Sequence, residues 1–192
     1  ELQLTESVGM QMLSDVPLGA FLSGGVDSSL IVGLMQKQSR RPVKTFTIGF
    51  SEAGFNEAEH ALAVSRHLGT EHMEIYIQPK DALDVISHLP AIYCEPFADS
   101  SQIPTFLVSQ LAKQQVSVAL SGDAGDELFG GYNPYQFTPQ AWNHVSKVPI
   151  SLRRLAASSL KLLPLRGRVQ KLVDIMNTST REDFYRQMIS HW

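Results

Sequence analysis

The chain has 192 residues, of which 43% are hydrophobic and 18% are charged, and its formal net charge is −3. This length allows a domain with a real core, and the charge gives no sign of a general nucleic-acid surface. No apolar run approaches the roughly 18 residues of a membrane span, and the N-terminus does not resemble a signal peptide. The only cysteine, Cys94, excludes an internal disulfide. We therefore expect a cytoplasmic protein with no nucleic-acid or membrane partner.

The two ends of the sequence suggest a larger parent protein. The chain begins at Glu1 without a methionine and ends at Trp192 within a helical pattern. We therefore expect it to be a piece of a longer protein.

The first part of the chain alternates strands with helices. An apolar run at 17–22 predicts a buried strand, and the β-branched and aromatic run at 43–50 predicts a second one. Between them, four apolar residues fall on one helical face, namely Leu30, Ile31, Leu34 and Met35.

Helix and strand signals continue along the chain. Asn56 and Glu59 have the spacing of a capping box, and Gly69 is a plausible helix end. Alternation at 73–77 predicts a third strand. Pro79 opens a predicted helix that reaches about Tyr93, and a further helix is expected at about 104–114, before a fourth strand at 116–120.

Strands separated by helices predict an α/β fold with a doubly wound, mostly parallel sheet and helices on both faces. Beyond Pro149 the pattern becomes helical, with helices expected near 150–163, 167–176 and 180–190. We predict an α/β core over about 5–135 and a helical extension over about 136–192, with a seam near 133–149.

A glycine-rich turn follows the first predicted strand. Ser23-Gly24-Gly25 lies between this strand and a helix, where backbone N–H groups and hydroxyls can hold an anion, most naturally phosphate. Asp27 would repel a phosphate but suits a Mg²⁺ bound to phosphates. The alternative is an ordinary helix start, with Ser and Asp as caps. The turn is not a Walker A loop, because no Gly-Lys-Ser/Thr follows.

The fourth predicted strand ends in a similar turn. Ser121-Gly122 follows it, and three acids come next, Asp123, Asp126 and Glu127. Because the carboxyl ends of parallel strands share one edge, the two turns could face each other across a polyphosphate, with Asp27 and Asp126 sharing the metal. The alternative is an acidic turn placed for the helix macrodipole.

The motifs of these loops carry a family resemblance. "SGGVDSS" resembles the pyrophosphate loop of the PP-loop ATP pyrophosphatases, whose fold is adenine nucleotide alpha hydrolase-like. Together with "DVPLGAFLSGG", "EPFADSSQIPT" and "LSGDAGDELFGGY", it makes residues 5–135 similar to the synthetase domain of glutamine-hydrolysing asparagine synthetases.

The resemblance implies a reaction and its site. Family members use Mg-ATP to adenylate a carboxylate, release pyrophosphate, and let ammonia displace AMP to form an amide. The resemblance places ATP and Mg²⁺ at Ser23, Gly24, Gly25, Asp27, Ser28, Ser121 and Gly122. It adds Phe21 and Ile48 as backbone contacts of the adenosine, Asp126 as a metal-associated acid and Asp123 as a candidate general base.

The resemblance also implies partners. The substrates would be ATP, a carboxylate such as aspartate, and ammonia from glutamine, supplied by an N-terminal glutaminase domain that this chain lacks. A homodimer is a further expectation. A lysine that family members carry downstream would lie beyond Trp192, so we expect the chain alone to be inactive.

Two departures keep other reactions open. Asparagine synthetases often have Glu at Asp123, and relatives often have Asp at Cys94. The shorter acid at Asp123 is more typical of relatives that amidate other carboxylates, such as polysaccharide sugar acids. The further alternatives are ring closure as in β-lactam synthetase, a non-catalytic nucleotide-binding domain, and a GMP or NAD synthetase, which "GDELFGGY" fits poorly.

Other polar positions carry weaker hypotheses. The segment with Glu95, Asp99, Ser100 and Ser101 either borders the carboxylate pocket or is a polar loop. We expect His60 and His67 to face solvent and Cys94 to be a buried small side chain. A basic stretch is expected to form the solvent-exposed face of helices. The less frequent alternative is that it contacts another domain or a partner protein. Its members are Arg153, Arg154, Lys161, Arg166, Arg168 and Lys171.

Overall fold

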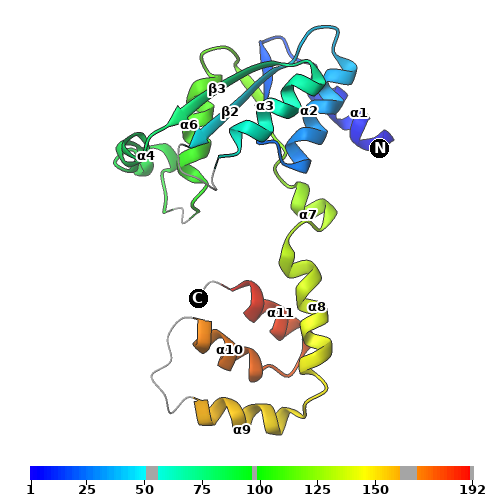
Figure 1. The fold of residues 1–192 in the computed structure, drawn as a ribbon, viewed down its shortest axis with the longest axis vertical. Coiled ribbons are helices and arrows are strands. Elements are labelled where there is room, and N and C mark those ends of the chain that lie inside the picture. The colour runs from blue at the N-terminus through cyan, green and yellow to red at the C-terminus, as the bar shows by residue number, and fades with distance from the viewer. Residues whose placement is uncertain (51–55, 97–98, 161–167, 191–192) are drawn as a thin grey trace. The chain divides into compact units, whose positions relative to one another are not determined.

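The computed structural model describes residues 1–50, 56–96, 99–160 and 168–190 (Figure 1). The chain forms two compact units, Glu1–Asp123 and Ala124–Trp192. The four strands found in the described residues all belong to the first unit.

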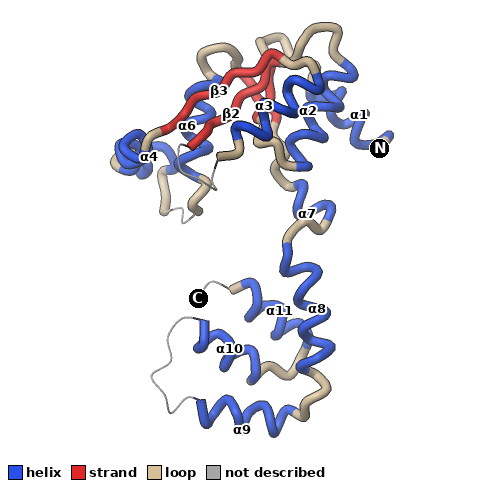
Figure 2. The backbone as a smooth tube through the Cα atoms, in the orientation of Figure 1, coloured by secondary structure: helices blue, strands red, loops and turns tan. Residues whose placement is uncertain are grey.

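The first unit is built on a parallel sheet, whose strands are drawn in red in Figure 2. Its strands are β1 (Leu18–Phe21), β2 (Lys44–Phe50), β3 (Glu71–Ile77) and β4 (Val118–Leu120). Their order in the sheet is β3-β2-β1-β4, and every neighbouring pair is parallel. The first strand and the last strand in sequence are therefore hydrogen-bonded neighbours, with Leu18 opposite Val118 and Ala20 opposite Leu120.

Helices cover both faces of this sheet. They are α1 (Leu2–Gln11), α2 (Val26–Gln38), α3 (Ala58–Leu68), α4 (Pro79–Ile86), α5 (Leu89–Tyr93) and α6 (Gln102–Ala112). On one face, Ala20 and Leu22 pack with Val8 of α1, Val32 of α2 and Ala61 of α3.

The opposite face of the sheet packs on α6. Phe46 of β2 is fully buried there against Ala112 and Val116, with Phe21 and Met73 beside them. Because side chains alternate along a strand, Ala20 and Phe21 of β1 go to opposite faces, and both faces are apolar. The doubly wound α/β fold predicted from the sequence is confirmed.

The local predictions for this unit are mostly confirmed, with two corrections. All four strands form where they were expected, and Gly69 ends α3 in the left-handed conformation, with φ +71°. The predicted capping box is wrong, because Glu57 is the N-cap and Asn56 instead accepts a 3.2 Å hydrogen bond from the amide of Ala58.

The second correction concerns the single helix predicted from Pro79 to about Tyr93. It is two helices, α4 and α5, with a break at 87–88. Pro90 lies in the first turn of α5 and has no N–H to bond a carbonyl in the preceding turn, so a continuous helix would lose a hydrogen bond there.

The second unit consists of helices within its described residues. These are α7 (Gly125–Phe129), α8 (Asn133–Val145), α9 (Ile150–Leu160), α10 (Arg168–Met176) and α11 (Arg181–Ile189). Phe184 of α11 is 1% exposed and contacts Trp142 of α8, with the ring centroids 5.4 Å apart. The helices expected after Pro149 are confirmed, whereas α8 formed in the region interpreted as a seam.

The basic stretch does not form a uniformly wet face. Arg153 is buried, and its guanidinium donates hydrogen bonds to the carbonyls of Val148 and Thr178. Lys171 is half-buried and bonds the carbonyls of Met188 and Ser190, at the end of α11. For these two residues the prediction of solvent exposure is wrong, because backbone carbonyls at helix ends take up their charge. Arg154 is exposed, as expected. Lys161 and Arg166 lie outside the described residues, as does the side chain of Arg168.

Candidate active site

The turn after β1 is held to the start of α2 by serine hydroxyls. The Oγ atoms of Ser23 and Ser28 are 2.9 Å apart, and the amide of Ser23 donates to Ser28 Oγ at 3.2 Å. Ser23 Oγ in turn accepts a hydrogen bond from the amide of Gly25 at 3.2 Å. These bonds hold the turn against the start of the helix.

The first turn of α2 has free donors. Gly25 is its N-cap and makes no side-chain cap, and no hydrogen bond within the described residues uses the amides of Val26, Asp27 or Ser28. The buried Oγ of Ser29 has no partner there either. The aligned dipoles of α2 add a partial positive charge at this end, so the turn suits an anion.

The carboxylate of Asp27 lies in the same turn. It is half-buried and makes neither a hydrogen bond nor an ion pair within the described part of the chain. A carboxylate kept free beside an anion-binding turn fits a cation that bridges the two.

The second predicted turn lies directly against the first. A Cβ built on Gly122 would be 2.6 Å from the amide nitrogen of Ser28 and 2.9 Å from the carbonyl carbon of Asp27. Only a residue without a side chain allows this approach. The pairing of β1 with β4 therefore brings the Ser121-Gly122 turn onto the start of α2. The placement of a polyphosphate between the two turns stays a prediction.

One contact of the first turn was not expected from the sequence. Gly24 has φ +81°, and a Cβ on it would lie 2.6 Å from the amide of Ala61 and 2.7 Å from the carbonyl carbon of His60. Helix α3 thus buttresses the turn from behind. The only sequence signal was a glycine pair followed, about 35 residues later, by the small residue Ala61.

The acids after the second turn have their own local partners. Ser121 Oγ donates a 2.9 Å hydrogen bond to Asp123, which is exposed and ends the first unit. The next residue, Ala124, has φ +69°, a left-handed conformation that a residue with a side chain rarely adopts.

Asp126 and Glu127 belong to the second unit, in the first turn of α7. The side chain of Asp126 lies where a Cβ on Gly131 would be, so position 131 also requires glycine. Tyr132 donates a 2.9 Å hydrogen bond to Glu127, and this bond raises the pKa of the Tyr132 hydroxyl to about 12. No sequence pattern predicted this partner of Glu127. The sharing of a metal by Asp27 and Asp126 stays a prediction.

The predicted adenosine contacts lie on strands. Phe21 is the last residue of β1, opposite Phe46, and Ile48 lies in β2 opposite Ile75. Both are half-buried. Their roles, which are assigned to the backbone, stay predictions.

The remaining candidates gain little support. Asp99 is exposed and accepts a 2.7 Å hydrogen bond from the amide of Ser101, which lowers the pKa of its carboxyl group. This is a local turn contact. Glu95 and Ser100 are exposed, and part of this segment, 97–98, lies outside the described residues.

Cys94 and the histidines give one correction and one confirmation. Cys94 is exposed, with φ 62°, so the prediction that it is buried is wrong; it terminates the short helix α5 and packs in no core. His60 and His67 are exposed on α3, as expected.

A metal site made of protein ligands alone is absent from the described residues, where no group of three or more His, Cys, Asp and Glu side chains is placed to hold an ion. Mg²⁺ is usually bound in another way, by one or two carboxylates together with substrate phosphates. The free carboxylate of Asp27 fits that mode.

The parallel sheet and the two glycine turns at its carboxyl edge define an α/β domain suited to binding an anion. The family model described as Asparagine synthase matches residues 1–192. The chain therefore belongs to the asparagine synthase family, whose members are carbon–nitrogen ligases.

Relatives within the family carry matching names. The chain is 38% identical over 165 residues to asparagine synthetase [glutamine-hydrolyzing] 1 of Bacillus subtilis, covering 85% of this chain and 26% of that protein. It is 34% identical over 156 residues to asparagine synthetase B [glutamine-hydrolyzing] of Escherichia coli, covering 72% of this chain and 27% of that protein. The chain thus spans about a quarter of the length of these relatives.

A solved structure of NMN synthetase from Francisella tularensis is 17% identical to this chain, with a TM-score of 0.48. The match covers 70% of this chain and 58% of the NMN synthetase chain. In the part of the chain that the structure describes, no helix has the length and apolar character needed to cross a bilayer.

Proposed function

We propose that this chain binds Mg-ATP and contributes to the ATP-dependent amidation of a carboxylate. The observation that carries the proposal is the contact of Gly122 with the backbone of Asp27 and Ser28. It supports a single anion site formed by two turns. The names of the relatives make aspartate the carboxylate that we propose, with asparagine as the product and glutamine as the source of ammonia.

The reaction that we propose has two displacements. A carboxylate oxygen attacks the α-phosphorus of ATP, the bond to the leaving pyrophosphate breaks, and an acyl-adenylate forms. Ammonia then attacks the acyl carbon, and AMP leaves as the amide forms. In this proposal an N-terminal glutaminase domain in the whole protein supplies the ammonia.

The described residues have defined roles in this proposal. The amides of Val26, Asp27 and Ser28 hold the departing pyrophosphate, and they are already oriented before the reaction. Ser121 and Gly122 contact the same phosphates from the other turn. Mg²⁺, held by Asp27 and Asp126, would neutralise charge on the pyrophosphate.

Two further assignments rest on the family resemblance. Phe21 and Ile48 would hold the adenosine through their backbones. Asp123 would act as a general base towards the attacking ammonia, and its hydrogen bond from Ser121 would orient it.

The test is calorimetric titration of the full chain with pyrophosphate and ATP, with and without Mg²⁺. We expect Mg-dependent binding that weakens at least about 10-fold in Asp27→Ala, because the metal loses a ligand. Gly122→Val should also abolish binding, because its side chain would clash with the backbone of Asp27 and Ser28 and force the two turns apart. Asp15→Ala is the matched control, since Asp15 is an exposed acid outside both turns.

Equal binding by the wild type and Asp27→Ala would contradict the metal assignment. The reaction itself is tested on the whole protein with ATP, glutamine and aspartate. The release of AMP and pyrophosphate supports adenylation, and the release of ADP rules it out.

A further inference from the structure

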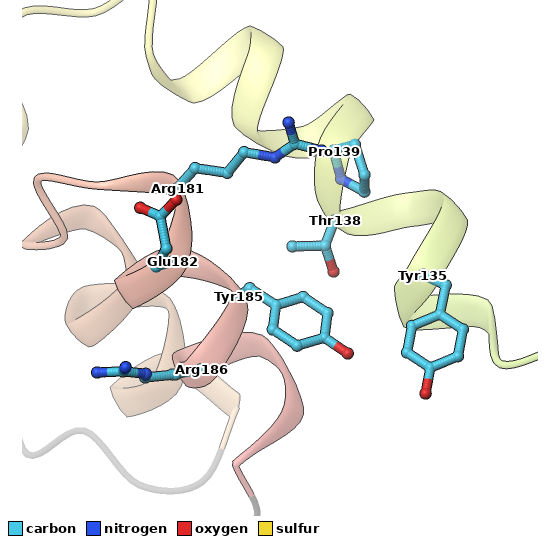
Figure 3. A pocket seen from close by; sticks show the side chains of 7 residues that line it. All are labelled: Tyr135, Thr138, Pro139, Arg181, Glu182, Tyr185 and Arg186. Carbon is cyan, nitrogen blue, oxygen red and sulfur yellow. The ribbon is translucent and has the colours of Figure 1, made fainter. Parts of the chain in front are cut away.

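The second unit contains a cavity of about 520 Å³ between α8 and α11 (Figure 3). This volume lies within the range of small-molecule sites in proteins. Tyr135 and Thr138 line it from α8, and Arg181, Glu182, Tyr185 and Arg186 line it from α11. All of these residues lie within one compact unit.

Two tyrosines give the cavity a flat aromatic wall. The ring centroids of Tyr135 and Tyr185 are 6.5 Å apart and their planes differ by only 18°. Figure 3 shows the two rings side by side with their faces turned in the same direction. Tyrosine rings can stack against the face of a ring-shaped ligand, and here the hydroxyl groups of Tyr135 and Tyr185 also interact with each other.

A buried hydroxyl in the wall has no partner. Thr138 is 1% exposed, and its Oγ1 makes no hydrogen bond within the described part of the chain. Figure 3 shows this oxygen on the side of Thr138 that faces the tyrosine pair. Buried hydroxyls are nearly always paired, so an unpaired one in a cavity wall points to a ligand that supplies the partner.

The charges around the cavity favour an anion. Arg181 extends from α11 towards Pro139 on α8 and makes no ion pair among the described residues. Arg186 makes one exposed contact of 3.9 Å with Asp183, outside the cavity lining. Glu182 is the only carboxylate in the lining, and Figure 3 shows the Arg186 side chain extending away from the tyrosine pair, so Arg181 is the cation available to a ligand. A guanidinium free of a protein partner is suited to a carboxylate, which it can bind through two hydrogen bonds.

We propose that this cavity binds a small molecule in which a carboxylate is attached to a six-membered ring. The ring would stack on the Tyr135–Tyr185 wall, Arg181 would bind the carboxylate, and Thr138 would hydrogen-bond to an oxygen of the ligand. An aromatic acid and a cyclic sugar acid share this chemistry. The proposal is independent of the proposed function, because it uses no residue of the two phosphate-binding turns.

The test is calorimetric titration of the full chain, without nucleotide, with benzoate and with glucuronate. Benzyl alcohol and glucose serve as their uncharged counterparts. We expect at least one acid to bind with a Kd of about 1 mM or tighter, and its uncharged counterpart to bind at least about 10-fold more weakly. Binding of benzoate alone assigns an aromatic acid, and binding of glucuronate alone assigns a sugar acid.

Variants separate binding from folding. Arg181→Gln and Thr138→Val should each weaken binding of the acidic ligand at least about 10-fold. Arg154→Gln removes an exposed arginine outside the cavity and should leave this binding unchanged. Thr138→Val should unfold at a temperature no lower than the wild type, because it replaces an unpaired hydroxyl with a methyl group of similar size. Its weaker binding then cannot result from a loss of structure.

Three results would overturn the proposal. They are no binding of either acid up to about 10 mM, equal binding of charged and uncharged ligands, and undiminished binding in Arg181→Gln. Because nucleotide is absent from the titration, none of these results bears on the ATP site.

Discussion

Two glycines with positive φ show how differently single residues constrain this fold. Gly69 has φ +71°, and a Cβ on it would meet nothing within 4 Å. Gly24 has φ +81°, and a Cβ on it would lie 2.6 Å from the backbone of α3. The first glycine is needed for conformation alone, and the second is needed for conformation and for space.

Alanine substitutions separate these two requirements. Gly69→Ala should cost about 1 kcal/mol of unfolding free energy, which is the price of the left-handed conformation. Gly24→Ala should cost roughly 2 kcal/mol more, because the turn or α3 must also shift. Urea unfolding of the full chain measures both values. Equal costs would show that the turn moves away from α3 without strain.

Gly24→Ala should in addition weaken pyrophosphate binding. The displaced turn carries Ser23, whose hydroxyl contacts that of Ser28 at the start of α2. Gly69→Ala should leave this binding unchanged, because Gly69 lies at the end of α3 and belongs to neither turn.

Among the helices, one buried arginine joins segments that are distant in sequence. Arg153 of α9 donates to the carbonyl of Val148 at 3.0 Å and to that of Thr178 at 2.9 Å. Its guanidinium also lies 5.8 Å from the ring centroid of Trp142 in α8. No carboxylate pairs with it among the described residues, so two loop carbonyls and an aromatic ring take the place of a counter-ion.

Replacement of this arginine should therefore loosen the helical unit. Arg153→Met should lower the unfolding free energy by about 2–4 kcal/mol, because buried carbonyls lose charged donors. Arg154→Met is the control at the next, exposed position and should change it by less than about 0.5 kcal/mol. Thermal unfolding followed by circular dichroism compares the two. Similar values would mean that Arg153 contributes packing alone.

Across the whole molecule, a half-buried histidine links stability to pH. The Nδ1 atom of His72 in β3 is hydrogen-bonded to the hydroxyl of Thr45 in β2, at 2.9 Å. Its Nε2 atom is buried and has no partner in the described part of the chain. Burial lowers the pKa of His72 below its ordinary value of 6.5, and the nearby charge of Glu74 opposes this only in part.

The sign of the effect follows from this lowered pKa. Above pH 6.5 the imidazole is neutral in both states; below it, the unfolded chain takes up a proton more readily than the folded one. Stability should therefore fall as the pH drops from about 6.5 towards the lower folded-state pKa, and then level off. Urea unfolding between about pH 8 and pH 5 measures this slope.

His72→Gln should flatten that part of the profile. His67→Gln, at an exposed position on α3, should leave it unchanged. An identical slope in the wild type and His72→Gln would assign the pH dependence to other groups.

Much of the fold and part of the site could be predicted because their signals are local. Apolar runs, glycines and prolines follow the backbone itself, so β1 to β4 and the turns at Ser23 and Ser121 were located correctly. Helix α8 was missed because Pro139 and mixed polar residues interrupt its apolar pattern. The helix is stabilised by tertiary packing, such as the contact of Trp142 with Phe184 of α11.

By itself the sequence located the four strands, several of the helices, the two glycine turns and the family to which their motifs belong. The tertiary structure alone decided that β4 pairs with β1, that Gly122 lies against Ser28, and that Arg153 is buried while Cys94 is exposed. Strand pairing and burial join residues as far apart as Ala20 and Leu120, and they depend on how whole surfaces fit together. A local pattern carries no record of that fit, which is why the cavity between α8 and α11 could be found only in the folded chain.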